Sequence, residues 1–167
     1  MVIMKSYNHP FPPILNADTR ILFLGSFPSL TSFEYSFYYA HKSNLFWPIM
    51  ETIFDLSLPD REAKINFCLT HQIGLWDIIG SCERKNSSDS ALEAIIPNDF
   101  HTLLKRYPNI AVLGFTGRKA FDLFQKYFKD ISIETVLLPS TSAAYAAMTR
   151  EAKTVEYKVF VEKFLTV

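Results

Sequence analysis

The segment Arg20–Gly25 constrains the fold most strongly, because four consecutive apolar residues end abruptly in a glycine. A short, unbroken apolar run of this kind is typical of a strand that is buried on both faces of a parallel sheet. Gly25 permits a left-handed turn and the close approach of a ligand to the main chain, and Pro28 stiffens the chain that follows. We therefore predict a buried strand whose carboxyl end faces a ligand site.

Three further apolar runs lie downstream, and amphipathic helical patterns separate them. The predicted strands are Ile73–Ile79, which Asp77 interrupts, Asn109–Gly114 and Ile131–Leu138. Helices are expected from Asn44 to Phe54, Asp60 to Leu69, Asp99 to Leu104, Phe115 to Phe124 and Glu151 to Leu165. Strands that alternate with helices predict an α/β fold, a three-layer α/β/α sandwich around a central, mainly four-stranded parallel sheet.

The segments outside these elements are expected to be irregular. Residues 1–19 contain three prolines and are predicted to form an extended arm that lies on the rest of the protein. Gly80–Ser90 is predicted to be a polar, irregular loop. The chain of 167 residues is long enough for one full hydrophobic core, and we expect residues 1–167 to form a single domain.

The composition limits the partners and the location of the protein. Lys and Arg balance Asp and Glu at 17 each, and the pI is about 6.9, which argues against a large basic surface for nucleic acid but allows a small local contact. Cys68 and Cys82 match neither a disulfide framework nor a paired metal spacing, so we expect a reducing, cytoplasmic location and no metal. The first residues lack the pattern of a signal peptide, and no apolar run is long enough to cross a membrane.

The candidate functional residues cluster at the ends of the predicted strands. These ends carry Gly25–Ser29, Trp76–Asp77, Gly114–Lys119 and Pro139–Ser142. Because the carboxyl ends of parallel strands meet at one edge of a sheet, we expect these segments to surround one ligand site. Aromatic residues between positions 33 and 39 either line this site or merely close one end of the sheet.

Several candidate side chains also have plain structural interpretations. Asn44 and Thr116 can each cap a helix, and His41 can be an ordinary hydrogen-bond partner. Asp77 interrupts an apolar strand and needs a partner, so it is either a ligand acceptor or a structural anchor. Pro139–Ser142 offers hydroxyl and N–H groups that suit a phosphate, or it forms an ordinary serine-rich turn.

A second reading of the same residue types is a serine hydrolase. Ser26, His41 and Asp77 supply the three side-chain types of such a site, although Ser26 does not lie in the Gly-x-Ser-x-Gly pattern of these enzymes. A third interpretation is a non-catalytic nucleic-acid-binding module. Covalent labelling of Ser26 by a fluorophosphonate would identify the hydrolase.

Five blocks of the sequence resemble the hypoxanthine-DNA glycosylase family, a branch of the uracil-DNA glycosylase superfamily. The blocks are Gly25–Ser29, Tyr38–Trp47, Gly74–Glu83, Pro97–Phe100 and Leu138–Ser142, and the resemblance spans about Arg20 to Met148. Most of the superfamily has an Asp or Asn near the position of Phe27 and a His at that of Leu138. The differences here suit the hypoxanthine branch, whose catalytic Asn corresponds to Asn44.

The resemblance implies a monofunctional DNA glycosylase that hydrolyses the N-glycosidic bond of a deaminated base, most of all hypoxanthine and also uracil or xanthine, and leaves an abasic site. It implies no cofactor, and we expect a monomer whose partner is DNA containing such a base. Together with the strand-end argument it assigns catalysis to Asn44. The base-binding residues are then Gly25, Ser26, Phe27, Tyr38, Tyr39 and Asp77, and the DNA-binding residues are Ser29, His41, Arg118, Ser140, Thr141, Ser142 and Tyr145.

Overall fold

The central sheet has four parallel strands in the order β3-β2-β6-β7. The computed structural model describes residues 4–84 and 92–165. The strands are β2 (Ile21–Gly25), β3 (Ile73–Asp77), β6 (Val112–Thr116) and β7 (Glu134–Leu138). Their four carboxyl ends lie at the same edge of the sheet, as the sequence predicts.

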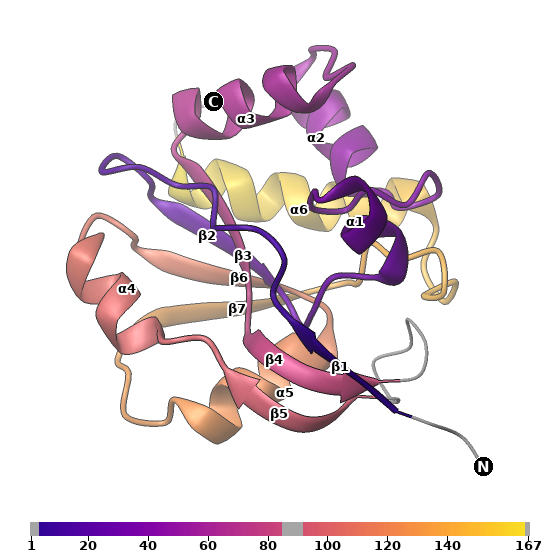
Figure 1. Cartoon of the computed structure of the whole chain (residues 1–167). Helices are drawn as coiled ribbons and strands as arrows, with labels where there is room; N and C mark the ends of the chain where they lie inside the picture. Colours follow the sequence, from indigo (N-terminus) through magenta and orange to yellow (C-terminus); the bar gives the residue numbers. More distant parts are fainter. Residues whose placement is uncertain (1–3, 85–91, 166–167) are drawn as a thin grey trace.

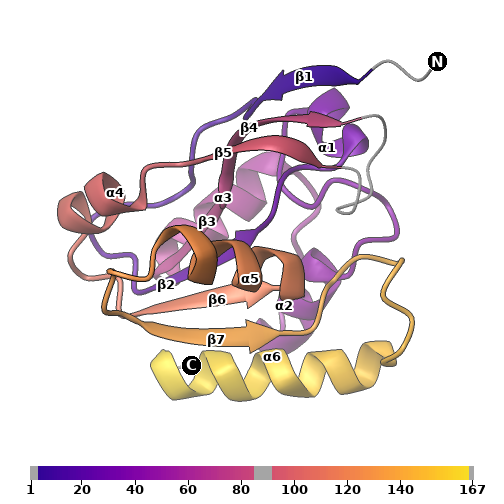
Figure 2. The same ribbon diagram turned by 90° about the horizontal axis from the view of Figure 1, so that it is seen from below.

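Helices cover both faces of this sheet. Along β2 the side chains alternate, because Ile21 and Phe23 enter one hydrophobic core and Leu22 and Leu24 enter another. The first core is closed by α2 (Phe46–Phe54), α3 (Arg61–Thr70) and α6 (Arg150–Phe164), and the second by α4 (Phe100–Arg106) and α5 (Arg118–Tyr127). Figure 2 shows α5 and α6 on opposite faces of the sheet. The predicted three-layer α/β/α sandwich is confirmed.

A second, antiparallel sheet lies beside the sandwich and was not predicted. It has the strand order β1-β4-β5, formed by β1 (Lys5–Asn8), β4 (Ile79–Arg84) and β5 (Glu93–Pro97). The expected strand Ile73–Ile79 therefore ends at Asp77, and the chain enters β4 two residues later. The prediction of an irregular Gly80–Ser90 is wrong for residues 80–84, and residues 85–91 lie outside the described part of the chain.

The N-terminal arm is held along its length. Its first described residues form β1, and further along Ile14 forms an antiparallel bridge with Leu75 of β3. Figure 1 shows the arm crossing in front of the central sheet, between the small sheet and α1. Beyond β1 the arm thus pairs with β3, the outer strand of the central sheet.

The segment between β2 and α2 contains a short helix that the sequence pattern did not reveal. This helix, α1 (Leu30–Tyr35), begins where the Ser29 hydroxyl accepts a hydrogen bond from the Ser32 amide at 3.1 Å. It ends at Ser36, which has a left-handed backbone with φ of +51°. The predicted DNA-binding residue Ser29 is therefore a helix cap as well as a residue near the strand end.

Two expected helix starts are capped by their first residue, and two candidate caps, Asn44 and Thr116, are wrong. The N-cap of α2 is Leu45, so Asn44 stands one residue before it. Asp60 caps α3 and Asp99 caps α4, each by accepting a hydrogen bond from a main-chain amide three residues later. Thr116 does not cap α5, because the N-cap is Gly117, whose φ of +131° favours glycine at this position. The hydroxyl of Thr116 is therefore not used as a helix cap, and Thr116 lies at the carboxyl edge of the sheet.

Candidate active site

A cleft of about 800 Å³ opens at the carboxyl edge of the central sheet. Its walls come from the segments that follow β2, β3, β6 and β7, which the sequence predicted to converge. The residues proposed from the sequence lie on it, apart from Arg118. Arg118 is the first residue of α5, its side chain is 70% exposed, and it lies 3.9 Å from Asp122 on the next turn. The cleft also includes Ser43, which the sequence analysis did not select, and Thr116, which it interpreted as a helix cap.

The floor of the cleft is built around Gly25. A Cβ atom placed on this residue would lie 2.7 Å from Oδ1 of Asp77, 3.5 Å from Oγ1 of Thr116 and 3.8 Å from the hydroxyl of Tyr39. Three polar oxygens from three different segments therefore gather over the bare Cα atom. Any side chain at position 25 would collide with the carboxylate, so the residue must be glycine for this arrangement to exist.

Asp77 is paired with His9 of the N-terminal arm. Nε2 of His9 lies 2.8 Å from Oδ2 of Asp77, and the two side chains are only 6% and 7% exposed. Nδ1 of His9 donates to the carbonyl oxygen of Phe11 at 2.7 Å. The sequence predicted a need for a partner but not its identity, because His9 lies 68 residues away in a segment that seemed a plain extended arm.

Tyr39 and Thr116 form the second polar pair of the floor. Their hydroxyl oxygens are 3.2 Å apart, and Thr116 donates to the carbonyl of Leu24 at 3.3 Å. Because a hydroxyl has one proton, Tyr39 is then the donor to Thr116, and the lone pairs of its own oxygen remain for a ligand. The ring of Tyr39 stacks on Phe46 at 4.2 Å, and burial raises the pKa of Tyr39 far above its usual value, which keeps the phenol protonated.

Aromatic side chains form the walls above this floor. The hydroxyl of Tyr38 donates to the carbonyl of Pro12 at 3.0 Å, so it is held by the arm, and burial raises its pKa. The ring of Phe27 packs against Phe33 at 5.5 Å and lies 5.1 Å from the guanidinium carbon of Arg84. The small sheet, which carries Arg84, therefore supports the wall of the cleft from behind.

Asn44 lies at the turn that leads into α2. Its side-chain oxygen accepts a hydrogen bond from the main-chain amide of Phe46 at 2.9 Å. The main-chain amide of Asn44 donates to the carbonyl of His41 at 2.9 Å. The next amide, of Leu45, donates to the carbonyl of Thr141 at 2.9 Å and ties this turn to the opposite wall. The Nδ2 group and the second lone pair of the amide oxygen face no recorded protein partner in the described residues. Although Leu45 is the N-cap of α2, the Asn44 side chain holds the first amide of the helix, and this contact is compatible with ligand binding.

The rim of the cleft is formed by the segment after β7. The hydroxyls of Ser140 and Ser142 each accept a main-chain amide two residues later at 3.2 Å, so their own protons remain available to a ligand. Thr141 between them is buried. Lys153 of α6, which the sequence analysis did not single out, lies beneath the segment. Its ammonium group donates to the carbonyl of Tyr145 at 2.7 Å and lies 5.0 Å from the centre of that ring.

His41 stands at the mouth of the cleft and does not face Asp77. Its Nδ1 accepts hydrogen bonds from the amide of Ser43 at 3.1 Å and from the hydroxyl of the same residue at 2.7 Å. The neutral imidazole therefore carries its proton on Nε2. Since His41 is bonded to Ser43 and Asp77 to His9, the Ser26/His41/Asp77 arrangement of a serine hydrolase is not assembled.

The described part of the chain shows neither a metal-binding cluster nor a membrane-spanning helix. Within residues 4–84 and 92–165, no three or more His, Cys, Asp and Glu side chains gather as they would around a metal ion. Over the same residues no helix is both long and apolar enough to span a membrane. Cys68 and Cys82 are both buried and are not joined in a disulfide.

Comparison with known proteins identifies the family. Residues 12–166 match the family model of the uracil DNA glycosylase superfamily. Two curated proteins named hypoxanthine DNA glycosylase, from Methanosarcina acetivorans and Methanosarcina barkeri, are 35% and 30% identical over 80% of this chain and 85% of theirs.

A solved structure agrees with this assignment. A protein from Methanosarcina acetivorans, solved by solution NMR as a candidate uracil DNA glycosylase, superposes with a TM-score of 0.76. It is 32% identical in sequence, and the match covers 91% of this chain and 96% of that one. The resemblance inferred from the five sequence blocks is confirmed. The chain belongs to the uracil DNA glycosylase superfamily, in the branch that the two hypoxanthine DNA glycosylases represent.

Proposed function

We propose that this protein is a monofunctional DNA glycosylase, with residues 1–167 as one catalytic domain, that removes a deaminated base from DNA and leaves an abasic site. Hypoxanthine is the preferred base, and uracil and xanthine are further substrates. The observation that carries the proposal is the floor at Gly25, where Asp77, Tyr39 and Thr116 place polar oxygens at the bottom of an aromatic-walled cleft. Membership of the glycosylase superfamily supports the choice of substrate.

The base enters the cleft after it leaves the DNA stack. Flipping a nucleotide costs a few kcal/mol, which contacts with its ring faces and its edge must offset. The ring of Phe27 supplies one apolar surface, and Tyr38 and Tyr39 supply others. Gly25 lets the plane of the base approach the main chain, so that its edge reaches the carboxylate of Asp77.

Asn44 acts on the water and on the charge that develops in the sugar. The glycosidic bond breaks through a state that resembles an oxocarbenium ion, which polar groups in fixed positions stabilise. An amide is too weak a base to take a proton from water, so Asn44 orients the water rather than deprotonating it. The hydrogen bond from the amide of Phe46 holds the side chain for this task. A slow reaction follows from this chemistry, because no strong base assists it.

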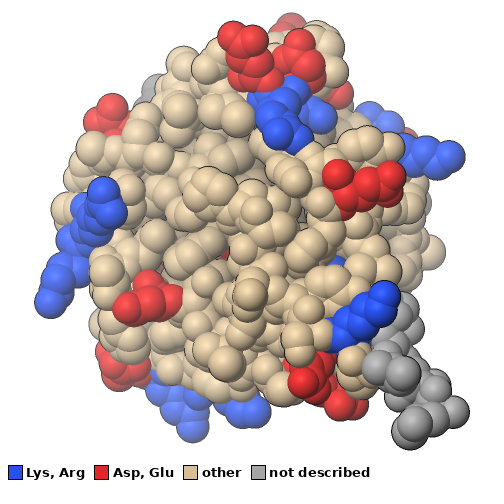
Figure 3. All heavy atoms as spheres, viewed as in Figure 1, with Lys and Arg blue, Asp and Glu red and all other residues tan. Residues whose placement is uncertain are grey.

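The rim binds the DNA backbone through a few neutral donors. The hydroxyl protons of Ser140 and Ser142 and the Nε2 proton of His41 are available at the mouth of the cleft, and Ser29 and Tyr145 also border it. Arg118 contributes a cation farther out. Figure 3 shows charges of both signs mixed around the margin of one face, which fits a protein that binds DNA by few phosphate contacts.

The cellular setting is proposed on simpler grounds. The two cysteines remain free, which suits a reducing compartment, so we place the protein in the cytoplasm. We also propose that it acts as a monomer, as expected from the sequence.

Base release from defined oligonucleotides tests the proposal directly. The full-length protein is incubated with otherwise identical strands that contain hypoxanthine, uracil, xanthine or only normal bases, and abasic sites are cleaved with alkali. We expect cleavage at hypoxanthine first and none in the normal strand. Both single-stranded and duplex substrates are included.

Two other outcomes have distinct meanings. Binding to the damaged strand without release of any base would replace the enzyme with a non-catalytic nucleic-acid-binding module. Release of normal bases at the same rate as hypoxanthine would overturn the assignment to deaminated bases.

A further inference from the structure

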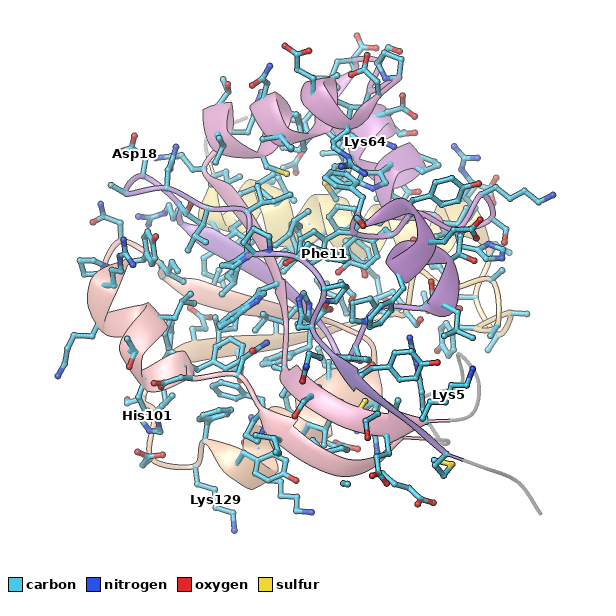
Figure 4. The ribbon with its side chains drawn as sticks, in the orientation of Figure 1. Lys5, Phe11, Asp18, Lys64, His101 and Lys129 are labelled. Atoms are coloured by element: carbon cyan, nitrogen blue, oxygen red, sulfur yellow. The ribbon has the colours of Figure 1, made fainter. Side chains whose placement is uncertain are left out.

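The proposed function uses the carboxylate of Asp77 but gives no role to its partner, His9. The pair of His9 and Asp77 is built from the N-terminal arm and the end of β3, and it is almost completely buried. The amide of His9 donates to the carbonyl of Gly80 at 2.7 Å, and its ring contacts that of Phe11 at 4.9 Å. Figure 4 places Phe11 at the centre of the molecule, over the sheet. The histidine is therefore fixed by both its main chain and its side chain.

The hydrogen bonds of His9 determine where the protons of the pair lie. The carbonyl of Phe11 can only accept, so Nδ1 of His9 carries a proton. Nε2 and Oδ2 of Asp77 are 2.8 Å apart, a distance at which two lone pairs do not face each other, so a second proton lies between them. This holds for an ion pair, with the proton on Nε2, and for a neutral pair, with the proton on Oδ2.

In both states the other carboxylate oxygen, Oδ1 of Asp77, carries no proton. This oxygen is the atom that lies 2.7 Å from the Cβ position of Gly25, and Asp77 lines the cleft. No hydrogen bond to Oδ1 is recorded within residues 4–84 and 92–165. The floor of the cleft therefore presents an oxygen that can accept a hydrogen bond but cannot donate one.

We propose that His9 is a positioning residue that makes Oδ1 of Asp77 an obligatory hydrogen-bond acceptor, and that this acceptor selects bases with a lactam N–H. Hypoxanthine has such a group at N1 and uracil at N3. Adenine and cytosine have a lone pair at the corresponding nitrogen, which faces the lone pairs of Oδ1 and is repelled. The group that deamination creates is thus the group that the pair recognises. This inference rests on the proposed function and names the atom that selects its substrates.

Loss of His9 should remove the selection and not merely weaken the pair. Without His9, no partner holds Oδ2 of this buried carboxyl group, and nothing determines which of its two oxygens carries a proton. A proton can then lie on Oδ1, which becomes a hydrogen-bond donor. It pairs with the N1 lone pair of adenine and no longer with the N1–H of hypoxanthine. Guanine supplies an internal standard, because it also has an N1–H and should respond to the change as hypoxanthine does.

Binding to uncleavable substrate analogues tests the proposal. Dissociation constants are measured for three duplexes that carry the 2′-fluoro-arabino analogue of deoxyinosine, deoxyadenosine or deoxyguanosine at one position. We expect the wild-type protein to bind the inosine duplex more tightly than the adenosine duplex. His9→Phe should reduce this ratio by about tenfold, the value of one hydrogen bond to a charged group, and leave the inosine-to-guanosine ratio unchanged.

Two further variants are matched controls. His9→Gln keeps an N–H group in reach of Oδ2 and should retain the wild-type ratio. His101→Phe removes a second His–carboxylate pair, in which Nε2 of His101 lies 2.6 Å from Asp130, but that pair is exposed and outside the cleft. Figure 4 shows His101 at the margin of the molecule, away from Phe11. This variant should change neither ratio.

The outcomes separate the inference from the proposed function. An unchanged inosine-to-adenosine ratio in folded His9→Phe, or an equal loss in His9→Gln, overturns the inference. A change of both ratios together also overturns it, because it indicates general damage to the cleft. Failure of the wild-type protein to release hypoxanthine from cleavable DNA overturns the proposed function instead.

If His9→Phe does not fold, Asp77→Asn decides the question. The Asn amide can donate through Nδ2 to the unprotonated Nε2 of His9, which again leaves Oδ1 as an acceptor toward the cleft. We therefore expect Asp77→Asn to keep the preference for inosine over adenosine. Loss of that preference in folded Asp77→Asn would overturn the inference.

Discussion

The floor and the rim of the cleft are built in opposite ways. On the floor, Gly25, Asp77 and Thr116 come from three strands, and their polar atoms are held by partners far away in the sequence, such as His9. On the rim, the hydroxyls of Ser140 and Ser142 accept hydrogen bonds from main-chain amides two residues away. The floor is thus fixed by the tertiary fold, whereas the rim is a local turn.

The difference teaches which kind of recognition each region can perform. A buried polar group without freedom to move discriminates strongly, because a mismatched ligand leaves it unsatisfied. An exposed hydroxyl on a turn can bond a phosphate of any nucleotide and carries no information on the base. We therefore expect substitutions on the floor to affect catalysis strongly and those on the rim to affect DNA binding weakly.

Gly25→Ala should have the largest effect. The added Cβ would meet Oδ1 of Asp77 at 2.7 Å, so the carboxylate or the strand end must move. A displacement of this size at a reacting centre lowers the rate by about a hundredfold. Single-turnover release of hypoxanthine measures it, and thermal unfolding serves as the control for the fold. Wild-type rates in a folded variant would show that the floor does not hold the base.

Asn44→Asp should have the next largest effect on the rate and little effect on stability. Asp can accept the hydrogen bond from the amide of Phe46 as Asn does, so the melting temperature should stay near that of the wild type. The new charge replaces the amide that orients water, and base release should change by about tenfold or more. If both the melting temperature and the rate are unchanged, Asn44 only holds the start of α2 and is not a catalytic residue.

Lys153→Met tests whether the rim depends on support from below. Lys153 is 2% exposed and donates to the carbonyl of Tyr145, so its loss should loosen the segment that binds DNA. We expect weaker DNA binding by a few-fold, about the value of one hydrogen bond, with unchanged release of base from bound substrate. Titrations with a damaged duplex and single-turnover rates at saturating enzyme separate the two quantities. A loss of rate at saturation would place Lys153 with the floor.

The stability of the same variant should depend on pH. Burial lowers the pKa of Lys153 from 10.5, so between the folded and the unfolded value the unfolded chain binds more protons. The free energy of unfolding of the wild type therefore rises with pH in this window, and that of Lys153→Met lacks this contribution. Thermal unfolding should show that the stability of the wild type, relative to that of Lys153→Met, increases as the pH approaches 10.5. The opposite slope would contradict the burial effect.

Local patterns predicted the central sheet but not the small one. The strands β2, β3, β6 and β7 are short apolar runs, and an apolar run reveals a doubly covered strand directly. The strand β1 (Lys5–Asn8) is mostly exposed and pairs with residues near position 84, so nothing local marks it. The strand β5 (Glu93–Pro97) is likewise exposed along most of its length. Antiparallel pairing over such a distance depends on the tertiary fold.

The same reasoning explains which site residues were found. Gly25 and Asp77 stand at the ends of predicted strands, so strand topology placed them in the cleft. Thr116 was assigned to a helix start because Thr is a good cap, but Gly117 takes that role and frees the hydroxyl. His9 gave no signal, since its role depends on where the arm lies and not on its neighbours in sequence.

Ser140→Ala should have the smallest effect and is the clearest test of the rim. The change removes one hydroxyl that accepts the amide of Ser142 and can donate to a phosphate. Affinity should fall about threefold, and by the same factor for damaged and undamaged DNA, because phosphate contacts carry no information on the base. The salt slope should hardly change, since a hydroxyl neutralises no phosphate charge. Fluorescence anisotropy over a series of salt concentrations measures both quantities. A variant that changed the ranking among bases would show that the rim, too, recognises the base, and the distinction between the two regions would fail.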